Sequence, residues 1–342
     1  MRAFKAIQKV RSVGPACFSA LLVASMVAGV GFHHPDARAE SSADWPSRAI
    51  QLIVPFAPGG GTDIVARVLA NALEPILKQT IVVENRAGAH GTIGAHRVSS
   101  AAPDGYTILH GTIGINAVNE YLYDNLPYDP KNAFLPVAKL TTTSNVLVVS
   151  SASPIHTLRD LIDTAHSNQG KLNYGIPAIG DSAHLGFEEF RRMADIKAQG
   201  VPYNGVPASL ADLVGGRLDM VTAAVQAAYP LISSGKLRPI AVLSEQRLAD
   251  LPDVPTIAES GFPGFYANGW QGIFLPAGTD SVIVNKLTDA IAKALQDPEL
   301  RSKAQALKLD LTYQNPEQFS AFIDSERKKW SAIIHEADIK VQ

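Results

Sequence analysis

Short apolar runs alternate with helical patterns along most of the chain, and this alternation limits the fold more than any other feature. In the clearest case, the apolar run Ile50–Val54 leads into the turn Pro58–Gly61, and apolar residues then recur at helical spacing from Ile64 to Leu73. Strands that lack internal polar–apolar alternation and are separated by helices form sheets with helices on both faces. The sequence therefore predicts an α/β fold of doubly wound, mostly parallel sheets.

The same pattern extends over the rest of the chain. Further strands are predicted at residues 80–84, 106–109, 146–150, 172–175, 219–223, 239–243 and 272–275. Further helices are predicted at residues 157–167, 183–194, 206–215, 226–234, 281–296 and 316–336. Pro75 lies inside the first helical pattern, and because proline disrupts helix interiors we expect it to kink or end that helix.

The length of 342 residues is large for a single hydrophobic core, so we expect two lobes. Hinges are predicted near residues 141–145, at a run of threonines, and near residues 260–266, which are rich in glycine and proline. If the chain crosses between the lobes at both places, residues 45–142 and 264–342 form lobe 1, and residues 143–263 form lobe 2.

The first 39 residues have the pattern of a secretory signal peptide. A basic start precedes a stretch without Asp, Glu, Lys or Arg from Ser12 to Pro35, and Ala37–Ala39 supplies the small-x-small pattern that signal peptidases cleave. An uncleaved membrane anchor is the alternative, which glycines and a proline within the apolar stretch disfavour. We expect export and cleavage after Ala39. The single cysteine, Cys17, lies within this leader.

Charge and cysteine content exclude several classes of protein. Removing the leader lowers the basic residues from 30 to 25 and the acidic residues from 32 to 31, which leaves a net charge of six negative. No long basic block is present, so a nucleic-acid-binding protein is not expected. Without cysteine, the mature chain has neither a disulfide framework nor a cysteine-ligated zinc site. An anionic ligand would need local donors, because the overall field does not attract it.

The segment Pro55–Asp63, called loop 1, follows the first predicted strand and contains three consecutive glycines. Ligands of open α/β sheets bind beyond the carboxyl ends of the strands. Glycine amides and the positive end of the following helix suit a carboxylate or phosphate, while Thr62 or Asp63 can cap that helix. The loop lacks the Gly-Lys-Ser/Thr ending of a phosphate loop, and Ile64 replaces the third glycine of the dinucleotide fingerprint. A tight turn without a ligand is an equal alternative for this loop alone.

The segment Gly175–His184, called loop 2, occupies the corresponding position in the other predicted lobe, between a strand and a helix. It offers Gly180 and Ser182 near the start of that helix. Two helix N-termini that point into one cleft could hold the carboxylates of a small organic acid. We therefore predict a ligand site between loop 1 and loop 2.

Nine motifs are distributed along essentially the whole mature chain: Trp45–Arg48, Ile53–Asp63, Val82–Ala89, Pro103–Thr107, Leu126–Asp129, Val201–Gly205, Asp212–Asp219, Leu251–Thr256 and Leu275–Thr279. In sequence and in order, these motifs resemble the Bug family, the extracytoplasmic solute receptors of tripartite tricarboxylate transporters. The motifs are long, so the resemblance is specific.

The resemblance implies a two-lobed periplasmic binding protein of type II, a Venus flytrap that closes on a small carboxylate. In that family, backbone groups of the loop matching Phe56–Asp63 hold the carboxylate, partly through ordered water, and the loop matching Gly180–Ala183 contacts it from the other lobe. The implied ligand residues are Phe56, Ala57, Gly60, Thr62, Asp63, Gly180, Asp181, Ser182 and Ala183. The resemblance also implies a periplasmic monomer that delivers its ligand to a two-subunit membrane permease, without catalysis, cofactor or metal.

Some positions of loop 2 depart from the family's pattern. Ile176, Pro177 and Ile179 make the loop more apolar, and Asp181 stands where a hydroxyl residue is common. An aspartate in the cleft would repel a second ligand carboxylate but could accept a hydrogen bond from an ammonium or amide N–H. A monocarboxylate with an apolar, aromatic or amine end is therefore favoured over a citrate-like polyanion. The alternative is that Asp181 only caps the following helix.

Four residues outside the loops are further candidates for the site. Asn116 follows a predicted strand closely enough to reach the cleft. Tyr203, Gln226 and Trp270 are second-tier candidates, and each of them is equally compatible with ordinary packing.

Two histidines, His90 and His110, each begin a His-Gly-Thr-Ile-Gly string. The match does not extend to either side, so we interpret it as chance similarity. The two side chains could ligate a metal or contact an anion. Without a carboxylate at paired spacing, we expect packing or loop roles for both.

A hydrolase is the second class of function that the sequence permits. Gly180–Ser182 resembles the serine block of GDS-type esterases, and Asp163–His166 supplies the Asp-x-x-His string of their relay. That string precedes the serine here but follows it in those enzymes, and it also fits a predicted helix. A ligand sensor that feeds a signalling pathway is a third class, which no residue decides.

Overall fold

A computed structural model describes residues 42–167, 171–336 and 339. The predicted signal peptide, its cleavage site after Ala39 and Cys17 lie outside these residues. Within the described part of the chain, the strands are β1 (Ile50–Val54), β2 (Ile81–Asn85), β3 (Thr107–Thr112), β4 (Phe134–Thr143), β5 (Asn145–Ser150), β6 (Leu172–Ile176), β7 (Ala198–Pro202), β8 (Met220–Ala224), β9 (Leu237–Val242), β10 (Gly269–Pro276) and β11 (Asp310–Gln314).

The helices of the same residues are α1 (Gly61–Leu77), α2 (Thr92–Ser99), α3 (Asn119–Leu122), α4 (Leu158–Ser167), α5 (Ser182–Met193), α6 (Val206–Val214), α7 (Val225–Ser233), α8 (Ser281–Ala294), α9 (Pro298–Ala306) and α10 (Pro316–Glu336), with a 3₁₀ turn η1 (Ala89–Gly91) and a π-helical turn η2 (Gly114–Val118). None of these helices has the length and hydropathy needed to cross a lipid bilayer.

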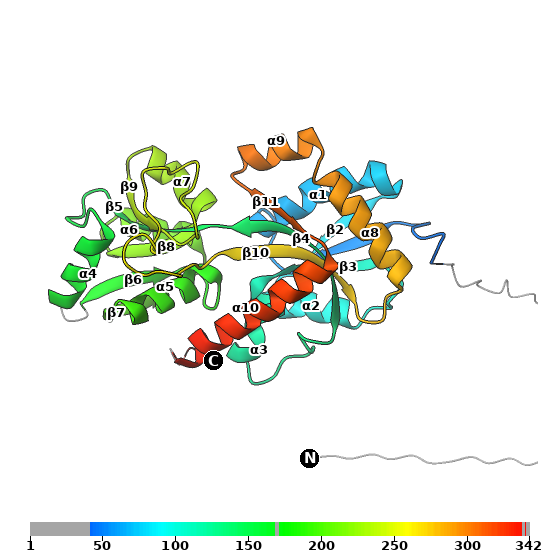
Figure 1. The fold of residues 1–342 in the computed structure, drawn as a ribbon, viewed down its shortest axis with the longest axis horizontal. Coiled ribbons are helices and arrows are strands. Elements are labelled where there is room, and N and C mark those ends of the chain that lie inside the picture. The colour runs from blue at the N-terminus through cyan, green and yellow to red at the C-terminus, as the bar shows by residue number, and fades with distance from the viewer. Residues whose placement is uncertain (1–41, 168–170, 337–338, 340–342) are drawn as a thin grey trace, which may run out of the picture. The chain divides into compact units, whose positions relative to one another are not determined.

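Sheet A contains six strands in the order β11-β4-β10-β3-β1-β2. β1 pairs in parallel with β2 and β3, whereas β10 pairs antiparallel with β3 and β4, and β11 pairs antiparallel with β4. Apolar residues of α1, α8 and α9 pack on one face of this sheet, and those of α2, η2 and α10 pack on the other (Figure 1). Successive residues of a strand point to opposite faces of the sheet. Ile108 packs with α1, α8 and α9, and Leu109 packs with the helices of the other face.

Sheet B contains five strands in the order β7-β6-β8-β5-β9. β6 pairs in parallel with β7 and β8, and β5 pairs antiparallel with β8 and β9. Helices α4 and α5 cover the face that carries Leu147, and helices α6 and α7 cover the face that carries Val146 and Val148. Each sheet, with helices on both faces, therefore forms one lobe.

The α/β class and the two-lobed organisation are confirmed, but the sheets are more antiparallel than predicted. Sheet A has two parallel and three antiparallel pairs of strands, and sheet B has two of each. The difference arises at the connections, because β4 continues almost directly into β5 and β10 returns alongside β4 in the opposite direction (Figure 1). The predicted lobe boundaries, near residues 142 and 263, stay predictions.

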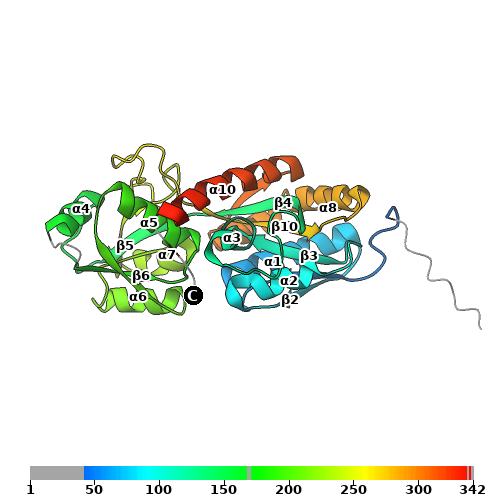
Figure 2. The same ribbon diagram turned by 90° about the horizontal axis from the view of Figure 1, so that it is seen from below.

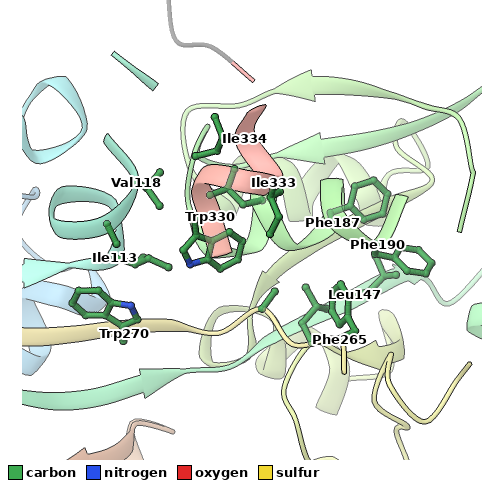
Figure 3. Packing of buried hydrophobic residues seen from close by; sticks show 14 of the residues in the cluster. Ile113, Val118, Leu147, Phe187, Phe190, Phe265, Trp270, Trp330, Ile333 and Ile334 are labelled. Atoms are coloured by element: carbon green, nitrogen blue, oxygen red, sulfur yellow. The ribbon is translucent and has the colours of Figure 1, made fainter. Parts of the chain in front are cut away.

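One hydrophobic cluster continues from sheet A to sheet B. It contains Trp330 of α10, Val118 of η2 and Phe187 of α5, which Figure 3 shows around a common interior. Helix α10 packs on β4 and η2 and also contacts α5, and Figure 2 shows its path to that helix. A salt bridge of 3.1 Å between Arg192 Nε and Glu336 Oε2 joins the two helices near their ends. Helix α10 is therefore a structural connection between the two lobes.

The first helix does not end at Pro75. Helix α1 continues to Leu77, and Lys78 in the left-handed conformation closes it with an amide hydrogen bond to Glu74 O. Proline removes one amide donor, and near the C-terminus of a helix this loss interrupts few later hydrogen bonds. Of the two expected effects, a kink or an end, the end lies two residues beyond Pro75.

Candidate functional site

A cavity of about 190 Å³ lies where loops of both sheets meet, and we call it the interlobe cavity. Phe56 of loop 1, His90 and residues 112–114 line it from sheet A, and residues 178–182 of loop 2 line it from sheet B. Asn119 and the crossing strands, through Thr143 and residues 269–271, complete the lining. Loop 1 and loop 2 therefore contribute to the same cavity.

Asp63 fixes the conformation of loop 1. Its Oδ2 atom accepts hydrogen bonds from the Gly59 amide at 2.9 Å and from Arg67 Nε at 3.0 Å, and its Oδ1 atom accepts one from Asn85 Nδ2 at 2.9 Å. Asn85 Nδ2 also donates to Phe56 O at 3.0 Å. The Arg67 guanidinium, followed by the Gly59 and Asn85 donors, holds the pKa of Asp63 at about 2 against the effect of burial.

The first turn of α1 offers amides to a ligand. Gly60 is the N-cap residue, and no side chain caps this helix end, because Asp63 is directed to the Gly59 amide. Within the described residues, the amides of Gly61, Thr62 and Asp63 have no hydrogen-bond partner. Such amides carry the positive end of the helix dipole. This end of loop 1 can therefore bind a carboxylate or another anion.

Loop 2 starts helix α5 with a capped turn. The Asp181 side chain accepts a hydrogen bond from the His184 amide at 2.8 Å, and the Gly180 amide donates to His184 Nδ1 at 3.1 Å. Burial raises the pKa of Asp181 to about 6, although the amides of His184 and Ala183 act in the opposite direction. Asp181 thus caps the helix, as the alternative interpretation expects, and it also lines the interlobe cavity.

The lining of the interlobe cavity contains no lysine or arginine. Its apolar side chains are those of Phe56, Ile113, Ala178, Ile179 and Trp270. Its neutral polar side chains are those of Thr112, Asn119, Thr143, Ser182 and Gln271, joined by His90 and by the carboxylate of Asp181. Any anionic group bound here would depend on neutral donors and backbone amides.

The structure leaves several predicted loop residues off the lining of the interlobe cavity. Ala57, Gly60, Thr62 and Asp63 belong to the adjoining part of loop 1, and Ala183 is buried in the first turn of α5. Phe56, Gly180, Asp181 and Ser182 are the predicted loop residues that line the cavity together. The roles of all nine in ligand binding stay predictions.

Of the four candidates outside the loops, Trp270 lines the interlobe cavity, and the other three do not. Asn116 is 1% exposed, and its carboxamide has no hydrogen-bond partner among the described residues. Tyr203 Oη donates to Asp212 Oδ2 at 2.8 Å, away from the lining, and Gln226 lines a separate cavity of about 650 Å³. Placing these three at the interlobe cavity would require a rearrangement that the described geometry does not contain. Trp270 lines the interlobe cavity, and its Nε1 atom donates to Glu326 Oε2 at 3.1 Å.

Sequence reasoning missed four polar residues of the lining: Thr112, Asn119, Thr143 and Gln271. Thr112 and Gln271 lie opposite each other in the antiparallel pair of β3 and β10. Gln271 is a polar residue in the otherwise apolar strand β10, and that contrast is the signal that could have marked it. Strand β3 also contains Thr107 and His110, so Thr112 does not stand out in the same way.

Both histidines of the repeated string have side-chain partners. His90 lines the cavity, adopts a left-handed backbone with φ of 52°, and forms a hydrogen bond through Nδ1 with the Tyr123 hydroxyl. His110 is buried on β3, where its Nε2 lies 2.9 Å from Gln271 Oε1. Over residues 42–167 and 171–336, no three His, Cys, Asp or Glu side chains gather in a group able to hold a metal.

The esterase relay does not assemble around Ser182. Its Oγ atom accepts a hydrogen bond from Asn145 Nδ2 at 2.9 Å, with no histidine as partner. His166 Nε2 bonds to the backbone oxygens of Ala194 and Asp195, beyond the C-terminus of the helix that Ser182 begins. At the helical rise, the twelve residues of α5 separate these ends by about 18 Å. This alternative for Ser182 therefore has no geometric support.

Replacing Asp63 with asparagine is expected to lower the free energy of unfolding by about 1–2 kcal/mol at pH 7, because the depressed pKa of Asp63 reports a favourable native environment. Because the Arg67 side chain is half-exposed, solvent screens this ion pair. The expected loss of stability is therefore smaller than the free energy that corresponds to the whole pKa shift. The contribution of Asp63 is present above pH 4 and is lost as the pH falls towards 2.

Urea unfolding at pH 7, 5 and 3.5 measures the difference between wild type and Asp63→Asn. We expect this difference to shrink as the pH falls. An equal difference at all three pH values would mean that the ion pair does not stabilise loop 1.

Two α/β lobes, joined by crossing strands and contributing paired loops to one cavity, define a solute-binding protein of the periplasmic binding-protein class. The sequence profile TctC, described as "Tripartite tricarboxylate transporter family receptor", matches residues 65–339. The chain belongs to this family of solute-binding receptors, which confirms the resemblance to the Bug receptors.

Individual relatives support the same assignment. The chain is 36% identical over 303 residues to Protein BugT of Bordetella pertussis, covering 88% of this chain and 93% of BugT. It is similar to the structure of the periplasmic binding protein BugD, with a TM-score of 0.76 and 32% identity over 87% of this chain and all of that one.

Two similar structures contain small acids. The protein Rpa4515 of R. palustris with adipate has a TM-score of 0.79 and 34% identity, covering 87% of this chain and 100% of that chain. The protein MatC (Rpa3494) of Rhodopseudomonas palustris with bound malate has a TM-score of 0.75 and 32% identity, covering 85% of this chain and 100% of that chain.

Proposed function

We propose that this receptor binds a small carboxylate in the interlobe cavity and delivers it to a two-subunit membrane permease of the tripartite tricarboxylate type. The observation that carries the proposal is that loop 1, through Phe56, and loop 2, through residues 178–182, line the same cavity, and that the two loops lead into helices α1 and α5. Amides at helix N-termini suit a carboxylate. The relatives that hold adipate and malate support a small acid as ligand.

The proposed ligand has one carboxylate and an apolar, aromatic or amine-bearing remainder. The lining supplies no lysine or arginine to balance a second carboxylate, and it contains the Asp181 carboxylate of loop 2. Phe56, Ile113 and Trp270 provide an apolar wall for the rest of the molecule. An ammonium group of an amino acid could donate to Asp181. An amino acid or aromatic acid therefore fits this chemistry better than citrate.

The proposed cellular setting is the periplasm, with the receptor acting as a monomer and without catalysis or a cofactor. Membership of the receptor family and the similarity to BugD support this setting. Delivery to the permease would follow closure of the two lobes on the ligand.

A thermal-shift screen tests the proposal with aspartate, nicotinate, malate, adipate and citrate, because a ligand that binds the native state raises the unfolding temperature. We expect nicotinate, which has one carboxylate and an aromatic ring, to give the largest shift and citrate the smallest. Native mass spectrometry of freshly purified protein provides an independent readout, since a retained small acid adds its own mass. Stabilisation by citrate alone would contradict the proposed ligand class, and a retained ligand without a carboxylate would contradict the function.

Replacing Asp181 with asparagine is expected to raise the affinity for adipate about tenfold at pH 8, because the change removes a negative charge from the cavity lining. Asparagine caps helices as well as aspartate does, so helix α5 keeps its N-cap. The pKa of Asp181 is about 6, so the advantage should decline as the pH falls below 6 and the wild-type carboxyl becomes neutral.

Calorimetric titration of both proteins with adipate between pH 5 and 8 measures the ratio of their affinities. Protonation of adipate affects both proteins equally, so it cancels in this ratio. Nicotinate is the control ligand, for which we expect a smaller gain. Equal adipate affinities at pH 8 would show that Asp181 does not face the ligand.

A further inference from the structure

His110 is a buried histidine whose two ring nitrogens have different environments. Its side chain is 0% exposed, and its Nε2 atom lies 2.9 Å from Oε1 of Gln271 on the neighbouring strand β10. Its Nδ1 atom is buried without a hydrogen-bond partner among the described residues. Gln271 in turn lines the interlobe cavity. The pair therefore connects the interior of sheet A with the candidate ligand site.

Burial fixes the protonation state of His110. Removal from water lowers its pKa to about 4, although Gln271 and Asp63 act in the opposite direction, so the ring is neutral at pH 7 and carries one N–H. With the proton on Nε2, the ring donates to Gln271 Oε1 and leaves a bare acceptor at Nδ1. The opposite tautomer would bury an unpaired N–H, and orphaned buried donors are rarer than under-satisfied acceptors. Nε2 is therefore the protonated atom.

This arrangement determines which end of the Gln271 carboxamide is available to a ligand. The oxygen is engaged by His110, and the Nε2 amide group has no hydrogen-bond partner in the described part of the chain. That nitrogen is also absent from the fully buried atoms that lack partners, so it is not completely enclosed by protein, and its residue lines the cavity. Thr112, opposite Gln271 in the strand pairing, lines the same cavity. Two neighbouring polar groups of the central strands thus border the space between the loops.

We propose that Gln271 contacts the ligand, donating a hydrogen bond from Nε2 to a carboxylate oxygen, and that His110 is the positioning residue that holds its carboxamide in this orientation. The inference rests on the proposed function of the cavity as a carboxylate site. A lining without lysine or arginine must satisfy carboxylate oxygens with neutral donors, and a fixed amide N–H is such a donor. Hydrogen bonds to a charged acceptor are stronger than neutral ones, so the contact would contribute to affinity as well as to orientation.

Calorimetric titrations with aspartate, nicotinate, malate and adipate test the proposal on five proteins: the wild type, Gln271→Leu, His110→Leu, His110→Gln and the double variant with leucine at both positions. For the acid that binds the wild type best, we expect Gln271→Leu to weaken binding about 10- to 100-fold, the loss of one hydrogen bond to a charged group. We expect His110→Leu to weaken binding about fivefold, because the carboxamide is then free to turn.

The remaining variants separate positioning from simple packing. Glutamine at position 110 keeps an N–H donor towards Gln271 Oε1, so His110→Gln should recover most of the affinity. The double variant should bind no more weakly than Gln271→Leu, because His110 acts through Gln271. Thermal unfolding of each free protein records any loss of stability, which a purely structural pair would show without these effects on affinity.

Wild-type affinity in Gln271→Leu, or losses in the two single variants that simply add in the double variant, would overturn the inference while leaving the proposed function intact. Reduced stability with unchanged affinity would also overturn it. If the wild type binds none of the four acids, the proposed function fails and the inference fails with it.

Discussion

Replacing Gly180 with valine is expected to weaken binding of the preferred small acid at least about a hundredfold, by combining backbone strain with a steric block. Gly180 has a φ of +80°, which a β-branched residue adopts only at a cost. A side chain at this position would overlap Cδ1 of Leu122, which belongs to α3 on the sheet A side. Valine would therefore distort loop 2 and separate it from the opposite wall of the cavity.

Gly216 provides the matched control for this variant. It has a φ of +72° in the same lobe, and a Cβ atom there would meet nothing within 4 Å. Gly216→Val should thus carry a similar backbone strain without blocking the cavity, and it should bind the acid as the wild type does. Calorimetric titration of both variants with aspartate and nicotinate makes the comparison. Equal binding by Gly180→Val and Gly216→Val would show that loop 2 does not need to approach Leu122.

Replacing Glu326 with leucine is expected to lower the free energy of unfolding by about 2–5 kcal/mol, because it leaves two indole N–H groups buried without an acceptor. Glu326 lies on α10 and is 1% exposed. Its Oε2 atom accepts hydrogen bonds from Trp270 Nε1 at 3.1 Å and from Trp330 Nε1 at 2.9 Å. Trp270 belongs to the crossing strand β10, so this carboxyl joins α10 to the connection between the lobes.

Glu326→Gln is the matched control, since it keeps a side-chain oxygen as acceptor and removes the charge. Burial raises the pKa of Glu326, which shows that its environment disfavours the charge, so the neutral amide should cost less than about 1 kcal/mol. Urea unfolding followed by tryptophan fluorescence compares the three proteins. If leucine and glutamine lower stability equally, the two indole hydrogen bonds do not contribute as argued.

Burial explains which elements could be predicted from the sequence. Strand β1 and helix α10 have the predicted bounds, because their apolar residues form an uninterrupted run or a regular helical spacing. Strands β7 and β11 were missed, and both lie at a sheet edge and are largely exposed or half-buried. Strand β4 was missed because Pro136 and Lys139 interrupt its apolar residues. Local sequence contains little information where strand pairing, instead of side-chain burial, forms the strand.

The candidate site shows the same limit at longer range. Loop 1 and loop 2 could be located from their own glycines and the helices that follow them, and the structure brings both to one cavity. The role proposed for Gln271 could not be predicted from local sequence, because it depends on His110, which is 161 residues away along the chain. Asn116 was favoured by its nearness in sequence to a strand end, which does not determine the direction of a side chain.

A titration followed by amide ¹H–¹⁵N NMR tests the central claim most directly, with the acid that gives the largest thermal shift added to the labelled receptor. The claim is that amides of both helix starts hold one anion between the lobes. We predict that the amide resonances of residues 61–63 and of residues 182–183 move together and saturate at the same ligand concentration. Saturable binding that leaves either group of resonances in place would contradict the account.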